Sequence, residues 1–484
     1  MPSSQSPSKH LLHWRDLYSE AELYKAAVRL YTKPLFDWRK ALVCAADGGT
    51  LYDFARHGMS RLRQLHSSLV RRQFEFRPAL ALHRNFNGKH RTLFVQPWEE
   101  RLVSLLLYRI LNVALDPGFS TCAYAYRCRG FGVDRCQQDI AAALRASARP
   151  LFIAKRDVSD FFASIDHGLL LDKIREHVAE DDFLNVIVSQ CVRFRYVDKG
   201  EVRTAERGVP FGTAIACLLA NLYLSELDHR LAAVGNIRFF RYADDMLVIS
   251  TQAEAAAAAA RILDGELERL GLRSKPSHET TFVLADRTGP DAPPAGSGPL
   301  PVLHKFRHLG LEFRADGSVG LSRDKFRKVC NLFRYAFRRN RRRFRRIVDW
   351  EQRAALAVRI ARETVEQGVR NVAIIDYYLR HVTDESQLQQ IDRWLAEEVL
   401  SLAFGGGHKK GYYRRLSVSR LRGMGLPSLV HRRRLLLHGH IQSSFFVWKV
   451  SKKQRGYGGQ AARRDRKPVD AFSQSPEAAA ESTS

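Results

Sequence analysis

The chain has 484 residues and a formal net charge of +27, from 78 Lys and Arg against 51 Asp and Glu. Such a positive surplus favours a polyanionic partner, nucleic acid before membrane, and no uninterrupted apolar stretch reaches the roughly 18 residues of a membrane span. The seven cysteines are scattered without a CxxC pair, which argues against a zinc site or a disulfide frame and indicates a reducing, cytoplasmic location.

The chain divides by pattern into four stretches. Residues 1–80 have the apolar spacing of helices and form an expected N-terminal helical extension. From 81 to 320, short strand-like runs alternate with longer amphipathic stretches, which predicts an α+β fold. Residues 321–450 look entirely helical and strongly basic, and the polar tail at 451–484 is expected to be disordered.

Two stretches concentrate acidic residues next to apolar runs. "LFIAKRD" ends in Asp157, and "FFRYADDMLVIS" carries Asp244 and Asp245 between two runs that read as the strands of a buried hairpin. Carboxylates brought together in that way repel one another and lose hydration unless cations compensate them. Three such groups suit two divalent ions, Mg²⁺ with Mn²⁺ as a substitute, of the kind that serve phosphoryl transfer. Asp160 and Asp166 follow Asp157 in the sequence. For these two residues, a role as a helix cap or surface loop residue is as well supported as a role in the metal site.

The two stretches, together with four others in the right order, resemble the reverse transcriptase family. "YADD" before an apolar strand and the upstream "DVSDFFASIDH" resemble the catalytic palm of bacterial members: intron maturases, retrons and antiphage-defence enzymes. The other four similarities are "KHRTLFVQPWEERLVSLLLYRIL", "RGVPFGTAIACLLANLYLSELDHRL", "GLRSKPSHETTF" and "FRHLGLEF". The resemblance covers roughly 84–315 and implies a right-hand polymerase, with fingers and an antiparallel palm sheet at 81–320 and a helical thumb beyond.

The resemblance implies roles for individual residues. Asp157, Asp244 and Asp245 match the metal-binding carboxylates, and Lys275 matches the position that offers a proton to the leaving group. Other positions match the nucleotide-binding set, with cations for the triphosphate and an aromatic that blocks the ribose 2′ position: Lys89, Arg91, Phe162, Phe211 and Gly212.

Phe211 departs from the family pattern. In "VPFGT" it fills a slot where relatives usually carry Gln or another polar residue that contacts nucleotide or template. A Phe side chain at this position can only stack on the nucleotide or template, or block its access. The departure is consistent with unusual nucleotides, a restricted template or an unconventional way of priming.

The C-terminal stretch adds a separate nucleic-acid signal. "DKFRKVCNLFRYAFRRNRRRFRRI" (324–347) predicts a helix with an aromatic face for the core and a cationic face for a phosphate backbone, and 407–423 and 431–440 extend the positive charge. The expected partners are an RNA template or a structured non-coding RNA, dNTPs and the DNA product, with no membrane. A homo-oligomer or a second protein from the same locus stays open.

The sequence therefore predicts an RNA-directed DNA polymerase, with antiphage defence as the expected cellular role. Two alternatives remain at this stage. One is an untemplated or self-templated nucleotidyl transferase on the same palm, which Phe211 would help to explain. The other is a non-catalytic, maturase-like RNA-binding protein, against which the three acidic residues argue.

Overall fold

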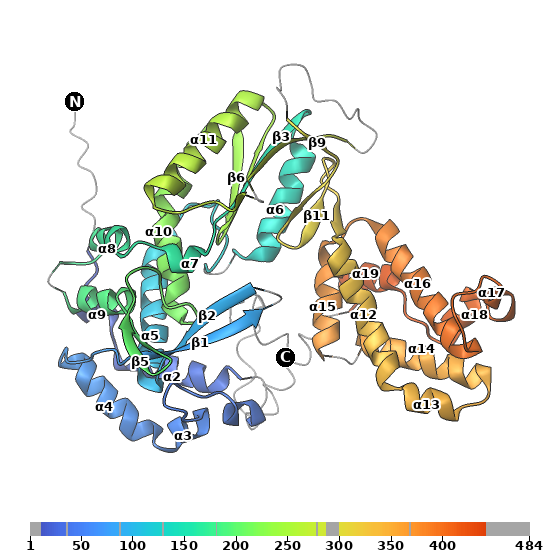
Figure 1. The fold of residues 1–484 in the computed structure, drawn as a ribbon, viewed down its shortest axis with the longest axis horizontal. Coiled ribbons are helices and arrows are strands. Elements are labelled where there is room, and N and C mark those ends of the chain that lie inside the picture. The colour runs from blue at the N-terminus through green and yellow to red at the C-terminus, as the bar shows by residue number, and fades with distance from the viewer. Residues whose placement is uncertain are drawn as a thin grey trace.

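The computed structural model describes residues 11–441 except 35–36, 87–88, 128–129, 181, 277–278, 287–299 and 367–368. An α/β body carries the N-terminal two thirds of the chain, and an all-helical region projects from one side of it (Figure 1). The expected disordered tail, 451–484, lies outside the described residues. No helix in the described part is long and apolar enough to cross a membrane.

The N-terminal part is helical because its apolar residues recur every three or four positions and its helix starts are capped. Leu23, Ala26 and Leu30 lie buried on one side of a helix whose N-cap, Ser19, accepts a hydrogen bond from the Glu22 amide. The elements are α1 (Trp14–Leu17), α2 (Glu20–Thr32), η1 (Asp37–Ala41), α3 (Leu51–Arg56) and α4 (Gly58–Val70).

A peripheral sheet follows in the strand order β2-β1-β4-β5. Its strands are β1 (Ala79–Phe86), β2 (Lys89–Val95), β4 (Arg195–Asp198) and β5 (Glu201–Thr204). β1 and β2 form an antiparallel hairpin from Leu80↔Val95 to Phe86↔Lys89, and the long helix α5 (Trp98–Leu115) continues from it. The helices η2 (Asp116–Gly118), α8 (His167–Arg175) and α9 (Phe183–Val192) complete this side of the body.

The central sheet has the order β6-β7-β3-β8-β9. Its strands are β3 (Leu151–Asp157), β6 (Ile237–Tyr242), β7 (Asp245–Ser250), β8 (Thr280–Leu284) and β9 (Val302–Leu303). β3 is antiparallel to both β7 and β8, so it is hydrogen-bonded on both edges.

Side chains alternate between the two faces of this sheet, as the period of a strand requires. One face, with Ala154, Met246 and Val248, packs in the same core as α10 (Ala214–Ala232) and α11 (Ala253–Arg269). The other face, with Ile153 and Leu247, packs in the same core as α6 (Val133–Ala146). The sheet is therefore buried on both sides, which explains why its strands read as continuous apolar runs.

The hairpin formed by β10 (Phe306–His308) and β11 (Leu311–Phe313), with β12 (Val319–Leu321), connects the body to the helical region. Leu309 and Gly310 both have positive φ, the conformation that a two-residue hairpin turn needs. The helices beyond are α12 (Arg323–Arg339), α13 (Arg341–Arg346), α14 (Trp350–Glu366), α15 (Val369–His381), α16 (Glu385–Phe404), α17 (Tyr412–Arg415), α18 (Val418–Gly423) and α19 (Leu429–Leu437).

The basic helix expected at 324–347 is present but interrupted. α12 ends at Arg339 and α13 begins at Arg341, with Asn340 between them. Val329, Phe333 and Phe337 face the core, as the aromatic spacing predicts. These side chains share one core with β3, β7 and β10–β12, so the helical region packs against the same hydrophobic cluster that supports the central sheet.

Candidate active site

The central sheet brings together the acidic residues that the sequence singled out. Asp157 ends β3 and Asp245 begins β7, and the two lie directly opposite each other in the antiparallel register. Asp244 precedes Asp245 in the turn between β6 and β7, where Tyr242 pairs with Asp245. Three carboxylates from two distant parts of the sequence therefore meet at one end of the sheet.

The turn that carries Asp244 is tight and strained. Ala243 has φ of 54°, in the left-handed region that a residue with a Cβ seldom adopts. A positive φ at the first position of a two-residue loop matches the twist of the flanking strands. The strain therefore accompanies a turn that aims Asp244 and Asp245 at the end of β3.

The crowding of the carboxylates is visible in their electrostatics. Burial, then Asp245 and Asp157, raise the pKa of Asp244 from 3.8 to about 6. A positive charge at this point would relieve both the burial and the repulsion. One cation is already present, because Lys275 Nζ lies 2.8 Å from each carboxylate oxygen of Asp157.

The backbone fixes the position of Lys275. Its amide donates to the carbonyl of Asp157 at 2.7 Å, and the Ser159 amide donates to the carbonyl of Arg273 at 2.8 Å. The segment after α11 thus runs antiparallel to the end of β3, with a bridge between Val158 and Ser274. The structure therefore places Lys275 among the three acids, where the resemblance put a proton donor.

Sequence reasoning missed a buried ion pair behind the turn. Arg241 and Asp228 have fully buried side chains, joined by bonds of 2.6 Å from Nε and 2.5 Å from Nη2. Arg241 Nη1 also donates to Asn221 Oδ1 at 3.1 Å and to the Ala243 carbonyl at 3.2 Å. The pair therefore links α10 to the strained turn. The available signal was weak: Asp228 and Arg241 are charged residues in largely apolar stretches, each of which also carries other charged residues.

If the two phenylalanines after Asp157 continued the strand, they would face opposite sides and differ in burial, but β3 ends before them. They begin the short helix α7 (Phe161–Ser164), preceded by Asp160 in a left-handed conformation. Phe161 is still buried and Phe162 half-buried, so their different environments hold. The reason is rotation about a helix, where neighbours lie about 100° apart, instead of strand alternation.

An aromatic cluster surrounds Phe162. Its ring lies 5.0 Å from Phe211 and 6.3 Å from Tyr126, measured between centroids. The Arg91 guanidinium lies over the Phe211 ring at 5.5 Å. Burial, then interactions with Cys217, Tyr242 and Asp244, raises the pKa of Tyr126 well above its usual value. Tyr126 is a further residue that the sequence did not single out.

The remaining sequence-predicted residues lie around this cluster. Phe211 fixes the β2 strand, because its carbonyl accepts from the Phe94 amide at 2.9 Å. Gly212 has φ of 102°, and a Cβ there would lie 3.7 Å from Leu93. Lys89 begins β2 opposite Phe86, and its side chain lies outside the described residues. Arg91 lies two residues further along β2 and pairs with Arg84 of β1.

Asp160 and Asp166 each lie at the start of a helix. Asp166 is the N-cap of α8, where its side chain accepts from the amides of Gly168 and Leu169, and it pairs with Arg207 at 3.2 Å. Asp160 precedes α7 without a side-chain cap. The capping interpretation therefore describes Asp166 well.

The carboxylate set fits a hard divalent cation by its chemistry. All three side chains supply oxygen ligands, and the raised pKa of Asp244 marks negative charge without full compensation. Among the described residues, no group of three or more His, Cys, Asp or Glu side chains is arranged so that it could already hold a metal ion. Lys275 covers both oxygens of Asp157. Metal binding would therefore require the ammonium to move aside.

Comparison with known proteins assigns this part of the chain. Residues 88–313 match the family model described as reverse transcriptase (RNA-dependent DNA polymerase). This stretch therefore resembles a reverse transcriptase domain. It contains the three carboxylates, Lys275 and the aromatic cluster around Phe162.

Curated relatives match over shorter stretches. Protein YkfC of Escherichia coli (strain K12) is 26% identical over 147 residues, which is 30% of this chain and 38% of that protein. The COX1/OXI3 intron 1 protein of Saccharomyces cerevisiae is 24% identical over 39% of this chain and 22% of its own length. The chain thus spans well under half of the relatives it matches.

Solved structures with similarity to this chain include fungal telomerases. Apo telomerase from Candida tropicalis has a TM-score of 0.43 at 12% identity, over 78% of this chain and 69% of that one. Telomerase from Candida albicans, with a fragment of telomeric RNA, has a TM-score of 0.39 at 13% identity, over 83% of this chain and 70% of that one.

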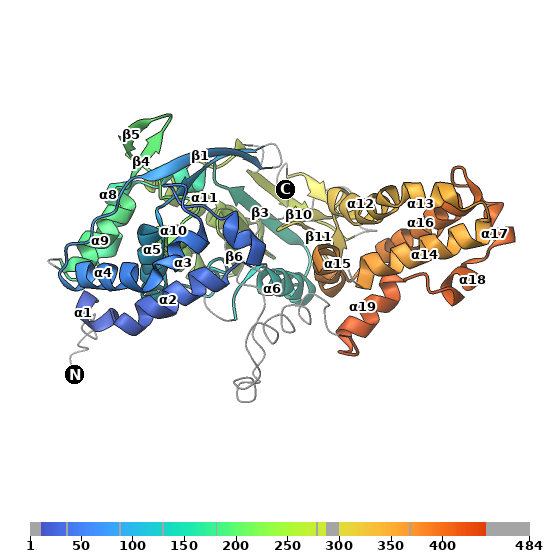
Figure 2. The same ribbon diagram turned by 90° about the horizontal axis from the view of Figure 1, so that it is seen from below.

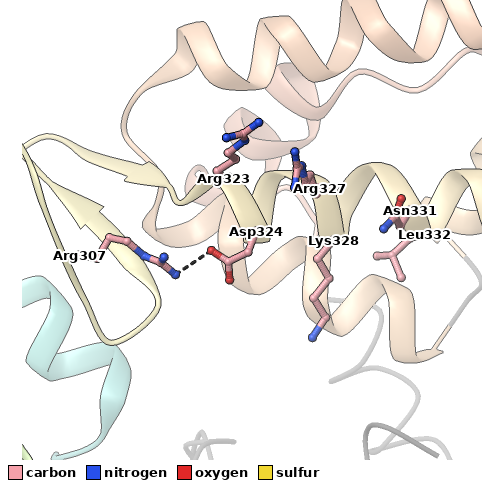
Figure 3. A pocket seen from close by; sticks show the side chains of 7 residues that line it. All are labelled: Arg307, Arg323, Asp324, Arg327, Lys328, Asn331 and Leu332. Atoms are coloured by element: carbon pink, nitrogen blue, oxygen red, sulfur yellow. Dashed lines mark hydrogen bonds and ion pairs between the residues drawn. The ribbon is translucent and has the colours of Figure 1, made fainter. Parts of the chain in front are cut away.

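A basic cavity lies next to the domain, where the β10–β11 hairpin meets α12. It has a volume of about 540 Å³, and its lining includes Arg307, Arg323, Arg327 and Lys328 (Figure 3). Arg307 and Asp324 point toward each other and pair at 2.7 Å. The Arg307 carbonyl also accepts a hydrogen bond from Lys155 Nζ at 2.5 Å. Since Lys155 lies two residues before Asp157 on the same face of β3, the cavity is connected directly to the carboxylate strand.

Proposed function

We propose that the chain is an RNA-directed DNA polymerase that adds dNTPs to a primer, with Asp157, Asp244 and Asp245 as its metal ligands. The observation that carries this proposal is the register of β3 and β7, which sets Asp157 opposite Asp245 with Asp244 adjacent, inside a domain that matches reverse transcriptases. Two Mg²⁺ ions, when bound, would activate the attacking hydroxyl and stabilise the leaving oxygen.

The side chains around the carboxylates have complementary tasks in this proposal. Arg91 would neutralise the triphosphate of the incoming nucleotide, together with Lys89 at the start of β2. Phe162 would pack against the sugar and exclude a 2′-hydroxyl, which restricts the product to DNA. Lys275, once displaced from Asp157, lies within reach of the leaving pyrophosphate as a proton donor.

The helical region would act as the thumb, with the primer strand in the basic cavity. The cavity is lined by Arg307 of the hairpin and by three cations of α12, Arg323, Arg327 and Lys328, which could contact phosphates (Figure 3). The Lys155–Arg307 hydrogen bond would then keep the bound strand in register with the carboxylates.

For the cellular role we propose antiphage defence with a structured non-coding RNA as partner. The support is the resemblance to defence-associated members and Phe211, which departs from the loop residue usual in relatives. Plaque formation on cells expressing the wild type should be reduced, and it should recover with Asp244→Ala/Asp245→Ala. Equal protection by both proteins would contradict a role that depends on synthesis.

The enzymatic proposal is tested by sequencing the nucleic acid that copurifies with the wild type and with Asp244→Ala/Asp245→Ala. DNA complementary to a copurifying RNA, absent from the variant, is the expected result. DNA of simple repeated composition without a matching RNA would instead support untemplated synthesis. RNA alone, identical in both samples, would overturn the polymerase proposal.

A further inference from the structure

Two basic stretches of the sequence have no place in the polymerase site. Residues 407–423 and 431–440 fold into α17, α18 and α19, and they converge with α16 around a second cavity of about 490 Å³. In both ribbon views α17 and α18 lie at the end of the helical region farthest from β3 (Figures 1 and 2). A ligand in this cavity is therefore separate from one at the carboxylates.

The cavity has the charge of an anion site. Arg393, Arg422 and Arg434 line it together with His431. The exposed Arg393 guanidinium has no ion pair within the part of the chain that the structure describes. Arg434 is partly committed, since it pairs with Glu385 at 3.1 Å. Arg393 is thus the cation that a ligand can recruit at least cost.

Asp392, the acidic residue in the cavity lining, already has hydrogen-bond partners within the chain. Asp392 accepts from the Ser428 hydroxyl at 2.6 Å and from the Leu429 amide at 2.7 Å, which fixes the start of α19. Arg422 lies 3.7 Å from the same carboxylate. Because Arg422 offsets the charge of Asp392, the lining carries more cationic than anionic side chains.

An aromatic side chain completes the lining. Tyr413 is half-buried in the cavity wall. Arginines that bind phosphates next to an aromatic ring that stacks on a base are the combination by which proteins hold unpaired nucleotides. A recess of this volume also suits one splayed nucleotide better than a rigid duplex.

We propose that this cavity binds an unpaired segment of nucleic acid, with a phosphate on Arg393 and Arg422 and a base against Tyr413. This rests on the proposed function only in naming the polymerase's own nucleic acid as the source of the segment. The site would hold a part of that molecule away from the template–product duplex.

The test is photocrosslinking of the full chain to single-stranded oligonucleotides of about eight nucleotides, RNA and DNA, that carry 5-iodouridine. Mass spectrometry should find a crosslinked peptide that contains Tyr413 with either strand. Tyr413→Phe should keep this crosslink and Tyr413→Leu, which preserves apolar bulk, should lose it. Crosslinks in the palm of the same variants serve as the internal control.

Affinity gives a second readout. Arg393→Ala should weaken binding several-fold and reduce the slope of log K against log salt by about 1, as expected for one lost phosphate contact. Arg359→Ala, at an exposed arginine of α14, is the matched control and should change neither value. Thermal melts of each variant should match the wild type.

Three results would overturn the proposal. They are the absence of a Tyr413 crosslink with both strands, equal effects of Arg393→Ala and Arg359→Ala, and full competition by an equal concentration of free nucleoside monophosphate. Incorporation of dNTPs on an annealed primer–template is measured separately. Wild type that crosslinks at Tyr413 without incorporation would refute the polymerase function alone.

Discussion

Arg241 and Asp228 form an ion pair in which neither side chain has exposed surface, and the same guanidinium donates to the carbonyl of Ala243. A paired charge in the core gains little stability over apolar residues of similar size, whereas one partner left alone is costly. The pair is therefore better explained as a device that fixes the position of the turn that carries Asp244 than as a source of stability.

If the ion pair positions the turn, variants of Asp228 and Arg241 should affect the stability of the fold and the activity differently. Asp228→Leu alone should lower the free energy of unfolding by about 3–5 kcal/mol, because it leaves the Arg241 charge buried without a partner. Asp228→Leu/Arg241→Met should recover most of that loss but leave dNTP incorporation severely reduced, since the turn has lost its anchor. Urea unfolding and a primer-extension assay measure the two quantities. Full activity in the double variant would show that the strand pairing alone holds the turn.

Asp244→Asn should stabilise the chain in a pH-dependent way. The pKa of Asp244 is raised from 3.8 to about 6, so the folded state binds the proton more tightly than the unfolded state. The resulting destabilisation is absent below the lower pKa, grows as pH rises between the two, and is complete above the upper one. The variant should therefore gain about 3 kcal/mol over wild type at pH 7.5, and almost nothing at pH 3.5.

The measurement is thermal or urea unfolding of both proteins across this pH range without divalent cations. Asp47→Asn, at an exposed acid of the N-terminal part, is the control and should show no such trend. Addition of Mg²⁺ should narrow the difference by stabilising the wild type. A gain that is independent of pH would contradict the raised pKa.

Phe162→Val should admit ribonucleotides. The smaller side chain removes the ring that faces Phe211 and Tyr126, and opens space for a 2′-hydroxyl. The ratio of kcat/KM for dNTP over rNTP should fall by roughly tenfold or more, within the 1–3 kcal/mol that pocket shape contributes to selectivity. Steady-state incorporation of matched dNTP and rNTP tests this. An unchanged ratio would leave Phe162 as a packing residue.

Phe211→Gln should weaken nucleotide binding through Arg91. The guanidinium lies 5.5 Å from the ring centroid, and the cation–π contact holds it over β2. Its loss should raise KM for dNTP about threefold to tenfold, which corresponds to about 0.5–1.5 kcal/mol, with little change in kcat. Phe211→Tyr keeps the ring and should behave as wild type. A lower KM in the Gln variant would mean that Phe211 obstructs the nucleotide.

The sequence predicted those parts of the site in which the type of a residue and its position next to an apolar run indicate the same role. Asp157 and Asp245 each stand at the end of an apolar run, so strand ends could be inferred and the pairing followed. The Phe161–Phe162 step could not be assigned from alternation, because two adjacent residues also differ in burial on a helix. Arg241 and Asp228 could not be identified from the sequence for a related reason. The role of each charged side chain in the core depends on a partner that is distant in the sequence.

The helical region shows the same limit. The spacing of aromatic residues predicted which side of α12 would be buried, whereas nothing local predicted that 407–423 and 431–440 would surround one cavity. That convergence depends on how four helices pack, and tertiary packing is not encoded in the periodicity of any one of them.

The order β7-β3-β8 also constrains when the protein can become active. The strand that bears Asp157 leaves the ribosome long before its two neighbours, which are contributed by residues 245–250 and 280–284. Until both have emerged, β3 has unpaired edges and its carboxylate has no partners. A nascent or prematurely terminated chain that ends before Asp244 therefore lacks two of the three acids, so the proposed synthesis of DNA would have to wait for translation to pass well beyond the middle of the chain.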